Sequence, residues 1–187
     1  MILLYYVSYF SGKLVLLLFI NILHLLMSIE SYYFYLELRE KMFELIIVVL
    51  IIIDQISKKY VQSSIRLGES VPVINDFFHI TYVENRGAAF GLLQDKQYIF
   101  IVIAILVVIG GIIYIHKSKE KKISKIAVAM ILAGAVGNLI DRIYLGYVVD
   151  FFDFRFIWNY VFNFADVLVV VGTFILCVYL LITGKEQ

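Results

Sequence analysis

Long apolar runs dominate the chain, and four of them after residue 42 have the length of a membrane-spanning helix. They extend from Phe43 to about Val61, from Tyr98 to Ile115, from Ile123 to Ile143 and from Asp166 to Ile182. A bilayer core of about 30 Å needs roughly 20 predominantly apolar residues of helix. The pattern therefore predicts four transmembrane helices.

The segment between the first two runs follows a different pattern. From residue 78 to residue 83, Phe, Ile and Tyr alternate with His, Thr and Val. Such alternation of β-branched and aromatic residues is typical of strands, and Gly68 and Asn75–Asp76 are candidate turns beside it. We expect a short pair of strands here, lying at the membrane surface.

Composition agrees with a membrane protein and not with a soluble one. Hydrophobic residues make up 63% of the chain and charged residues 17%, and the mean hydropathy is +0.94. Soluble domains are closer to half apolar and a quarter charged, so a soluble, disordered or collagen-like chain is excluded. The single cysteine, Cys177, excludes a disulfide-rich fold, and we expect its side chain to be a buried apolar filler.

A cluster of lysines predicts the orientation in the membrane. It lies between the second and third apolar runs, at Lys117, Lys119, Lys121, Lys122 and Lys125. Short loops rich in Lys face the cytoplasm, so alternation places residues 59–97 and 144–165 outside and Met42 and Gln187 inside. The predicted fold class is an all-α integral membrane protein, with four transmembrane helices and a small extracytoplasmic β element.

Residues 1–41 precede this pattern and form an N-terminal hydrophobic extension. Ile2 to Met27 is apolar with one lysine, Lys13, and lacks the basic start and the small-residue cleavage site of a secretory signal. Either it is a fifth membrane element or Met42 is the true start of the protein, which is the alternative that we favour. The expected domains are the extension, 1–41, and a four-helix membrane domain, 42–187.

Acidic side chains in or beside apolar segments are costly in a membrane and mark candidate functional sites. The predicted topology brings four of them, each from a different segment, to the outer side of the bilayer: Asp54, Asp141, Asp150 and Asp166. Asp153 lies in the same loop as Asp150, and we expect it to be a solvated interfacial charge. The convergence of four carboxylates favours a site at the outer face.

These residues also have structural interpretations, which the sequence leaves open. Asp54 and Lys58 are four residues apart on one helix face and can form an ion pair. Asn163 and Asp166 can cap the last helix, a role compatible with catalysis. A further cluster that can tie helix ends together consists of Asn138, Asp141 and Arg142.

Other classes of function fit the sequence less well. His24, His79 and His116 have no metal-ligand spacing, so we expect no metal, and the net charge of +1 indicates no nucleic-acid partner. A transporter or proton-conducting bundle would need acidic residues through the depth of the membrane, whereas here they gather on the outer side. A structural scaffold would not need Asn and Asp where packing requires neither.

Four stretches occur in an order that resembles bacterial lipoprotein signal peptidase, the type II signal peptidase. They are DQISKKYV (54–61), VENRGAAFGLL (83–93), AGAVGNLIDRIYLGYVVDFFDF (133–154) and FNFADV (162–167). The resemblance covers Met42 to about Gly184 and makes residues 42–187 a membrane peptidase domain. It implies an intramembrane aspartyl endopeptidase that cleaves prolipoproteins on the N-terminal side of a diacylglyceryl-modified cysteine.

The resemblance also implies roles for individual residues. The catalytic aspartates correspond to Asp150 in VVDF and Asp166 in FNFAD. The supporting or substrate-binding residues correspond to Asp54, Lys58, Asn85, Gly87, Asn138, Asp141, Arg142, Asn163 and Ala165. Three departures from the family pattern are Val167 in place of a serine, the extension, and a slightly short loop between the two aspartates.

The expected partners and location follow from the same resemblance. The substrates are lipidated prolipoproteins, membrane lipid surrounds the enzyme, and neither a metal nor a cofactor is implied. We expect a monomer in the bacterial cytoplasmic membrane, crossing it several times, with the active site at the outer face.

Overall fold

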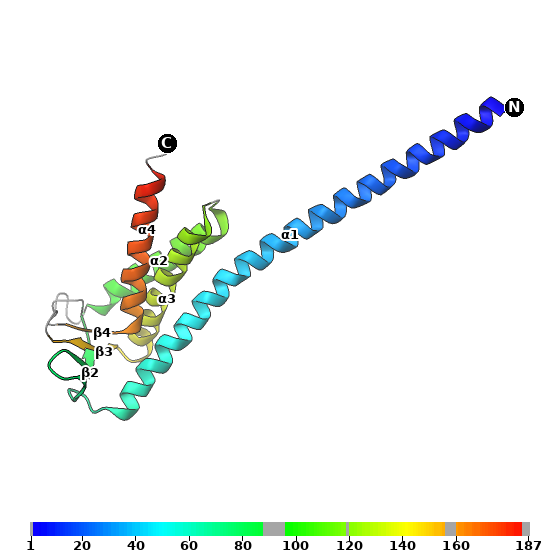
Figure 1. Ribbon diagram of the computed structural model, residues 1–187. Helices are drawn as coiled ribbons and strands as arrows, with labels where there is room; N and C mark the ends of the chain where they lie inside the picture. The colour runs from blue at the N-terminus through cyan, green and yellow to red at the C-terminus, as the bar shows by residue number, and fades with distance from the viewer. Residues whose placement is uncertain (1, 88–95, 119, 156–159, 185–187) are drawn as a thin grey trace. The chain divides into compact units, whose positions relative to one another are not determined.

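The computed structural model describes residues 2–87, 96–118, 120–155 and 160–184 (Figure 1). Lys119, Gln187 and the motif residues 88–93 lie outside the described residues. The chain divides into two units, residues 1–42 and 43–187, and helix α1 (Ile2–Ser64) contributes to both. In the first unit, every side chain whose burial is described is exposed.

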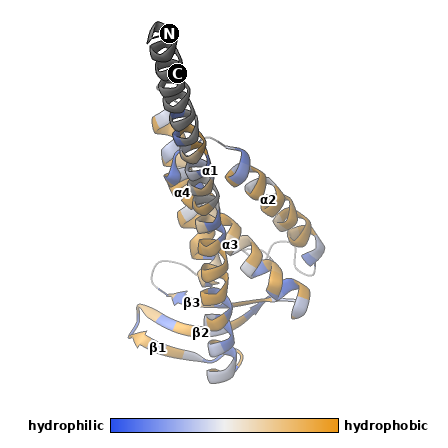
Figure 2. Ribbon diagram, turned by 90° about the vertical axis from the view of Figure 1, so that its right-hand side faces the viewer, coloured by the Kyte–Doolittle hydropathy of each residue, from blue (hydrophilic) through white to orange (hydrophobic). Residues whose placement is uncertain are grey.

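The second unit contains three further helices, α2 (Gln97–Lys117), α3 (Lys122–Tyr144) and α4 (Phe164–Thr183). Within the described ranges, these three are long and apolar enough to cross a membrane, and they match predicted spans to within two residues at each end. Figure 2 shows the hydrophobic colour along most of α2. The first predicted span, from Phe43 to about Val61, lies within α1 and is not one of these three membrane-capable helices. The count of four spans therefore stays a prediction.

An antiparallel sheet lies at the end of the second unit where α3 ends and α4 begins (Figure 1). Its strands, in spatial order, are β1 (Ser70–Ile74), β2 (Phe78–Asn85), β3 (Val148–Phe154) and β4 (Val161–Phe162). The expected strand pair is confirmed as β1 and β2, and Asp76 in its turn has a positive φ of 59°. Strands β3 and β4 were not predicted, because residues 148–151 are all buried and so show no alternation.

Close helix packing brings the end of α4 that carries Asp166 against α3. A Cβ atom on Gly134 would lie 2.3 Å from the carbonyl oxygen of Ala165, and one on Gly172 would lie 2.7 Å from that of Ala127. Small residues let backbones approach in this way, which is how membrane helices gain packing contacts. Both glycines are therefore needed for the spacing between α3 and α4.

Two expectations about single residues were wrong. Cys177 is exposed on α4 and is not a buried filler, because the outward faces of membrane helices are as apolar as their inward faces. Asp153 is not a freely solvated charge, since its side chain is 14% exposed and pairs with Arg155 at 3.2 Å. It also accepts a 2.7 Å hydrogen bond from the hydroxyl of Thr81, which links β3 to β2.

Candidate active site

Two aspartates from different elements meet at the sheet end of the second unit: Asp150 lies on β3 and Asp166 in the first turn of α4. The side chain of Asn163, the N-cap of α4, accepts a 2.9 Å hydrogen bond from the backbone N–H of Asp166. In return, the carboxylate of Asp166 accepts one of 3.2 Å from the backbone N–H of Asn163. This capping box satisfies two backbone donors at the start of the helix, and it confirms the predicted capping role.

Two side-chain amides connect the carboxylates. Nδ2 of Asn163 donates to Oδ1 of Asp150 at 2.6 Å, and Nδ2 of Asn138 donates to Oδ1 of Asp166 at 2.7 Å. The amides are themselves joined by a 3.1 Å hydrogen bond from Asn163 Nδ2 to Asn138 Oδ1. The two aspartates therefore belong to one hydrogen-bonded network, although one is on a strand and the other on a helix.

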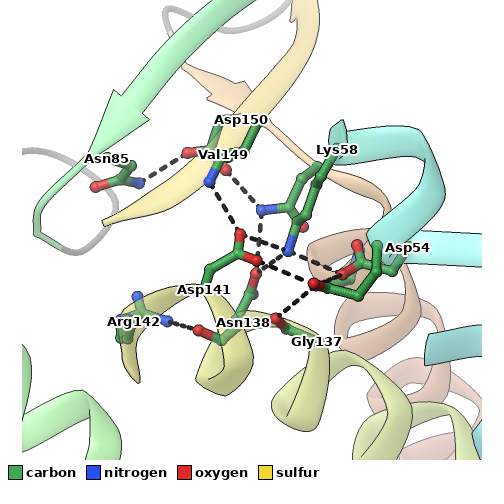
Figure 3. Close-up of polar contacts among 12 residues, drawn as sticks. Asp54, Lys58, Asn85, Gly137, Asn138, Asp141, Arg142, Val149 and Asp150 are labelled. Atoms are coloured by element: carbon green, nitrogen blue, oxygen red, sulfur yellow. Dashed lines mark hydrogen bonds and ion pairs between the residues drawn. The ribbon is translucent and has the colours of Figure 1, made fainter. Parts of the chain in front are cut away.

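The other oxygen of Asp150 is held by the end of β2. Nδ2 of Asn85 donates to Oδ2 of Asp150 at 2.9 Å, and Figure 3 shows the amide turned toward this carboxylate. The carbonyl oxygen of the Asn85 side chain accepts a 3.0 Å hydrogen bond from the backbone N–H of Gly87. This second bond orients the amide, because it assigns the carbonyl side to Gly87 and leaves the NH₂ group facing Asp150.

The environment of Asp150 changes its acidity. Burial, and secondly the nearby charge of Asp166, raise the pKa of the Asp150 carboxyl to about 7, against the opposing effect of hydrogen bonds from Asn85 and Asn163. The residue is 1% exposed, and a buried carboxyl beside another carboxylate favours its neutral form. Asp150 therefore keeps its proton at pH values where an exposed aspartate has lost it.

A buried lysine lies at the centre of the supporting residues (Figure 3). Nζ of Lys58 is 2.9 Å from Oδ2 of Asp54 and 3.0 Å from Oδ2 of Asp141, and it donates to Oδ1 of Asn138 at 3.0 Å. Lys58 is 2% exposed and Asp54 is fully buried. The predicted pair of Asp54 and Lys58 is thus present, but it is part of a larger network that reaches Asn138 and, through it, Asp166.

Gln55 belongs to this network, and the sequence analysis assigned it no role. Its Nε2 donates to Oδ2 of Asp54 at 3.1 Å, to Oδ1 of Asp141 at 3.0 Å and to the carbonyl oxygen of Gly137 at 3.2 Å. The residue follows Asp54 directly in the DQISKKYV motif. Its position in that motif was the available sequence signal, but a helix neighbour at i+1 is not expected to face the same partners.

The two supporting carboxylates each hold the backbone one residue before a member of the aspartate pair. Oδ1 of Asp54 accepts a 2.9 Å hydrogen bond from the N–H of Ala165. Oδ2 of Asp141 accepts one of 3.1 Å from the N–H of Val149. Ionised oxygens make strong hydrogen bonds of this kind, so these contacts position the chain segments that carry Asp166 and Asp150.

A cavity of about 920 Å³ opens beside the aspartate pair. Its polar end is lined by Asn85, Asn138, Arg142, Asp150 and Asp166. Its walls are mostly apolar and come from α2, α3 and α4, including Ile103, Val107, Ile131, Ala135 and Val169. An extended apolar ligand with a reactive polar group at one end fits this division.

Arg142 lies on the wall of this cavity and outside the buried cluster. Its Nη1 donates to the backbone carbonyl of Asn138 at 3.3 Å, and its guanidinium lies 5.0 Å from the ring centre of Phe100 on α2. The structure thus brings all eleven residues named by the resemblance to one region, with Gly87 and Ala165 contributing backbone donors. Among the described residues, no group of three or more His, Cys, Asp or Glu side chains is placed to hold a metal ion.

Comparison with known protein families identifies a match over most of the chain. Residues 46–182 match the family model described as signal peptidase (SPase) II. A lipoprotein signal peptidase of Clostridioides difficile (strain 630) is 54% identical over 137 residues, which cover 73% of this chain and 93% of the relative. A lipoprotein signal peptidase of Halothermothrix orenii is 46% identical over 136 residues, covering 73% and 92%.

Solved structures share the fold at lower identity. A bacterial membrane enzyme determined by the in meso method at 2.3 Å resolution has a TM-score of 0.73 and 33% identity, over 78% of this chain and 91% of the other. A second bacterial membrane enzyme, determined by the same method at 1.9 Å, has a TM-score of 0.69 and 34% identity, over 75% and 92%.

Proposed function

The chain belongs to the signal peptidase II family, and we propose that it is an intramembrane aspartic endopeptidase. Its substrates are diacylglyceryl-modified prolipoproteins, and it cleaves them on the N-terminal side of the lipidated cysteine. The relatives are named lipoprotein signal peptidases, which supports this class of substrate. The observation that carries the aspartic mechanism is the pairing of Asp150 and Asp166 through Asn163 at one end of the cavity.

The proposed mechanism uses one shared proton. Two close carboxyl groups cannot both ionise at low cost, so one stays protonated. The raised pKa of Asp150, about 7, makes it the candidate for the protonated member. The ionised Asp166 takes a proton from water, which attacks the scissile carbonyl, while Asp150 donates its proton to the developing oxyanion. When the tetrahedral intermediate collapses, Asp166 passes the proton it took from water to the leaving amine, and Asp150 regains a proton from the hydroxyl of the intermediate.

The cavity supports the placement of the substrate. The apolar signal segment and the acyl chains lie along the walls formed by α2, α3 and α4, and the scissile bond lies at the polar end beside Asp150. We place this end at the outer face of the bacterial inner membrane, which the protein crosses four times as a monomer. Residues 42–187 form the peptidase domain, and the family match lies within them.

Asparagine variants of the pair test the mechanism. Asp150→Asn and Asp166→Asn keep the shape of the side chain but remove the group that exchanges a proton. Such proton transfer contributes about 10²–10⁴-fold, and without the activated water we expect cleavage of a purified lipidated prolipoprotein to fall to background. Asp54→Asn and Asp141→Asn should instead lower the melting temperature in detergent and leave partial activity.

Asp153→Asn is the matched control, since Asp153 lies on the same strand as Asp150 but does not line the cavity. This variant should cleave close to the normal rate. Substantial turnover by Asp150→Asn or Asp166→Asn, with unchanged melting, would remove that residue from the mechanism.

A further inference from the structure

We propose that Arg86 is a specificity-determining residue, which favours substrates with an acidic side chain at one of the two positions after the lipidated cysteine. The inference rests on the proposed function and deepens it, because it concerns the choice among substrates of the same site. It follows from the position of Arg86, from the way its guanidinium is presented, and from the direction in which the substrate leaves the cavity.

Arg86 is one residue from a side chain that contacts the aspartate pair. It follows Asn85, the last residue of β2, whose amide donates to Asp150. Arg86 itself lines the cavity, and consecutive Cα atoms are about 3.8 Å apart. A substrate whose scissile bond lies at Asp150 therefore brings the one or two residues that follow the lipidated cysteine within reach of this long side chain.

The guanidinium is presented to solvent on an aromatic support. The Arg86 side chain is 59% exposed, and its Nη2 lies 3.3 Å from Oε2 of Glu84, whose side chain is 22% exposed. The guanidinium carbon lies 5.6 Å from the ring centre of Tyr147. Of the two charges of this ion pair, the positive one is therefore the more accessible to a ligand in the cavity mouth.

Glu84 has other donors and does not depend on Arg86. The hydroxyl of Tyr82 donates to its Oε1 at 3.4 Å. The pKa of the Tyr147 hydroxyl is raised, first by a hydrogen bond with Tyr82, then by partial burial and by a hydrogen bond with Glu84. Tyr147 is therefore neutral and lies against the Glu84 carboxylate. Exposed ion pairs are weak, and a guanidinium has five N–H donors, so Arg86 can bind a second carboxylate beside Glu84.

The walls of the cavity indicate which part of the substrate meets Arg86. The apolar walls, such as Val107 on α2 and Val169 on α4, suit the apolar signal segment, which precedes the cleaved bond. The polar chain after the bond must leave at the sheet end, where Arg86 lies. Arg142, the other cation among the described lining residues, is engaged with the Asn138 carbonyl and the Phe100 ring.

The test compares lipidated prolipoprotein peptides that carry Asp, Asn or Lys at the first or second position after the cysteine. Cleavage by the full-length wild-type protein should have kcat/KM about 2- to 5-fold higher for Asp than for Asn, the range of an exposed charge pair. In Arg86→Gln this ratio should fall to one, and Arg86→Lys should keep part of it. Arg66→Gln is the control, since Arg66 is exposed but does not line the cavity, and it should keep the ratio.

The outcomes separate the inference from the proposed function. Wild-type cleavage of the Asn peptide tests the function alone, whereas the Asp to Asn ratio tests Arg86. Equal ratios in wild type and Arg86→Gln, at both positions, would overturn the inference. It would also be overturned if Arg86→Gln slowed all peptides equally, and only in vesicles containing phosphatidylglycerol, since Arg86 would then bind a lipid phosphate.

Discussion

The carboxylate of Asp54 on α1 accepts a 2.9 Å hydrogen bond from the backbone N–H of Ala165, a residue 111 positions later in the chain. Ala165 directly precedes Asp166, and the side chain of Asp54 is fully buried. Asp141 makes the equivalent contact to Val149, directly before Asp150. Asp54 and Asp141 thus position the backbone that carries Asp166 and Asp150. This relationship explains why four acidic residues lie close together in the fold.

The buried cation of this network is expected to be essential for stability. Lys58→Met would leave Asp54 and Asp141 buried without their common positive partner, and breaking such a pair costs about 3–5 kcal/mol. Melting of the purified protein in detergent should therefore occur at a much lower temperature, with loss of cleavage. Lys59→Met is the control. Because Lys59 is exposed, this variant should melt at the wild-type temperature. Equal melting temperatures of the two variants would contradict the prediction.

Activity should depend on the proton of Asp150. Because its pKa is raised to about 7, cleavage should decline as the pH rises through this value and the proton is lost. The pair titrates as a unit, so loss of the remaining negative charge produces a second, acidic limb and a bell-shaped profile. The profile of kcat/KM against pH for a lipidated peptide measures both limbs.

The Asn85 hydrogen bond lowers the pKa of Asp150, so Asn85→Ala gives this prediction a direction. Removing the bond should move the alkaline limb to higher pH, whatever the change in maximal rate. An alkaline limb that stayed in place would show that Asp150 does not control it.

The close approach of α3 and α4 is expected to tolerate no side chain at Gly134. A methyl group there would lie 2.3 Å from the Ala165 carbonyl oxygen and 2.7 Å from Cγ2 of Val169. Overpacking of this kind costs about 1–3 kcal/mol, so Gly134→Ala should lower both the melting temperature and the activity. Gly110→Ala on α2 meets no atom within 4 Å and should leave both unchanged; a similar loss in both variants would contradict the packing argument.

The proposed orientation can be tested by labelling single cysteines from outside the cell. Cys177 is exposed and is first replaced by serine. A membrane-impermeant thiol reagent should then label Val73→Cys, on β1, and leave Lys121→Cys unlabelled until the membrane is opened. The serine variant alone is the background control, and the reversed pattern would place the aspartate pair on the cytoplasmic side.

The extension is expected to be dispensable for cleavage. Every residue that we place around the cavity lies between 43 and 187, and so does the family match. A protein that starts at Met42 should therefore insert and process a lipidated substrate at close to the full rate. Loss of both folding and cleavage would show that residues 1–41 stabilise the peptidase domain.

The sequence by itself determined the helices α2, α3 and α4, because a run of about 20 apolar residues has few alternatives to a membrane helix. The strand pair β1–β2 could likewise be predicted, since its alternation and its turn residues are local properties. The motifs also identified the residues around the candidate site, because each motif pairs polar side chains with apolar flanks where packing alone needs no polar group.

Tertiary structure decided which of these residues contact one another. Only the packing of α1 against α3 and α4 determines that Asp54 meets Ala165 and that Gln55 contacts Asp141. The burial of residues 148–151 of β3 is likewise a property of the folded chain. The exposure of Cys177 could not be predicted either, since apolar side chains suit lipid and protein interior alike. Hydropathy depends on each residue and its neighbours in sequence, whereas the partner of a buried carboxylate depends on the rotation and spacing of helices far apart in the chain.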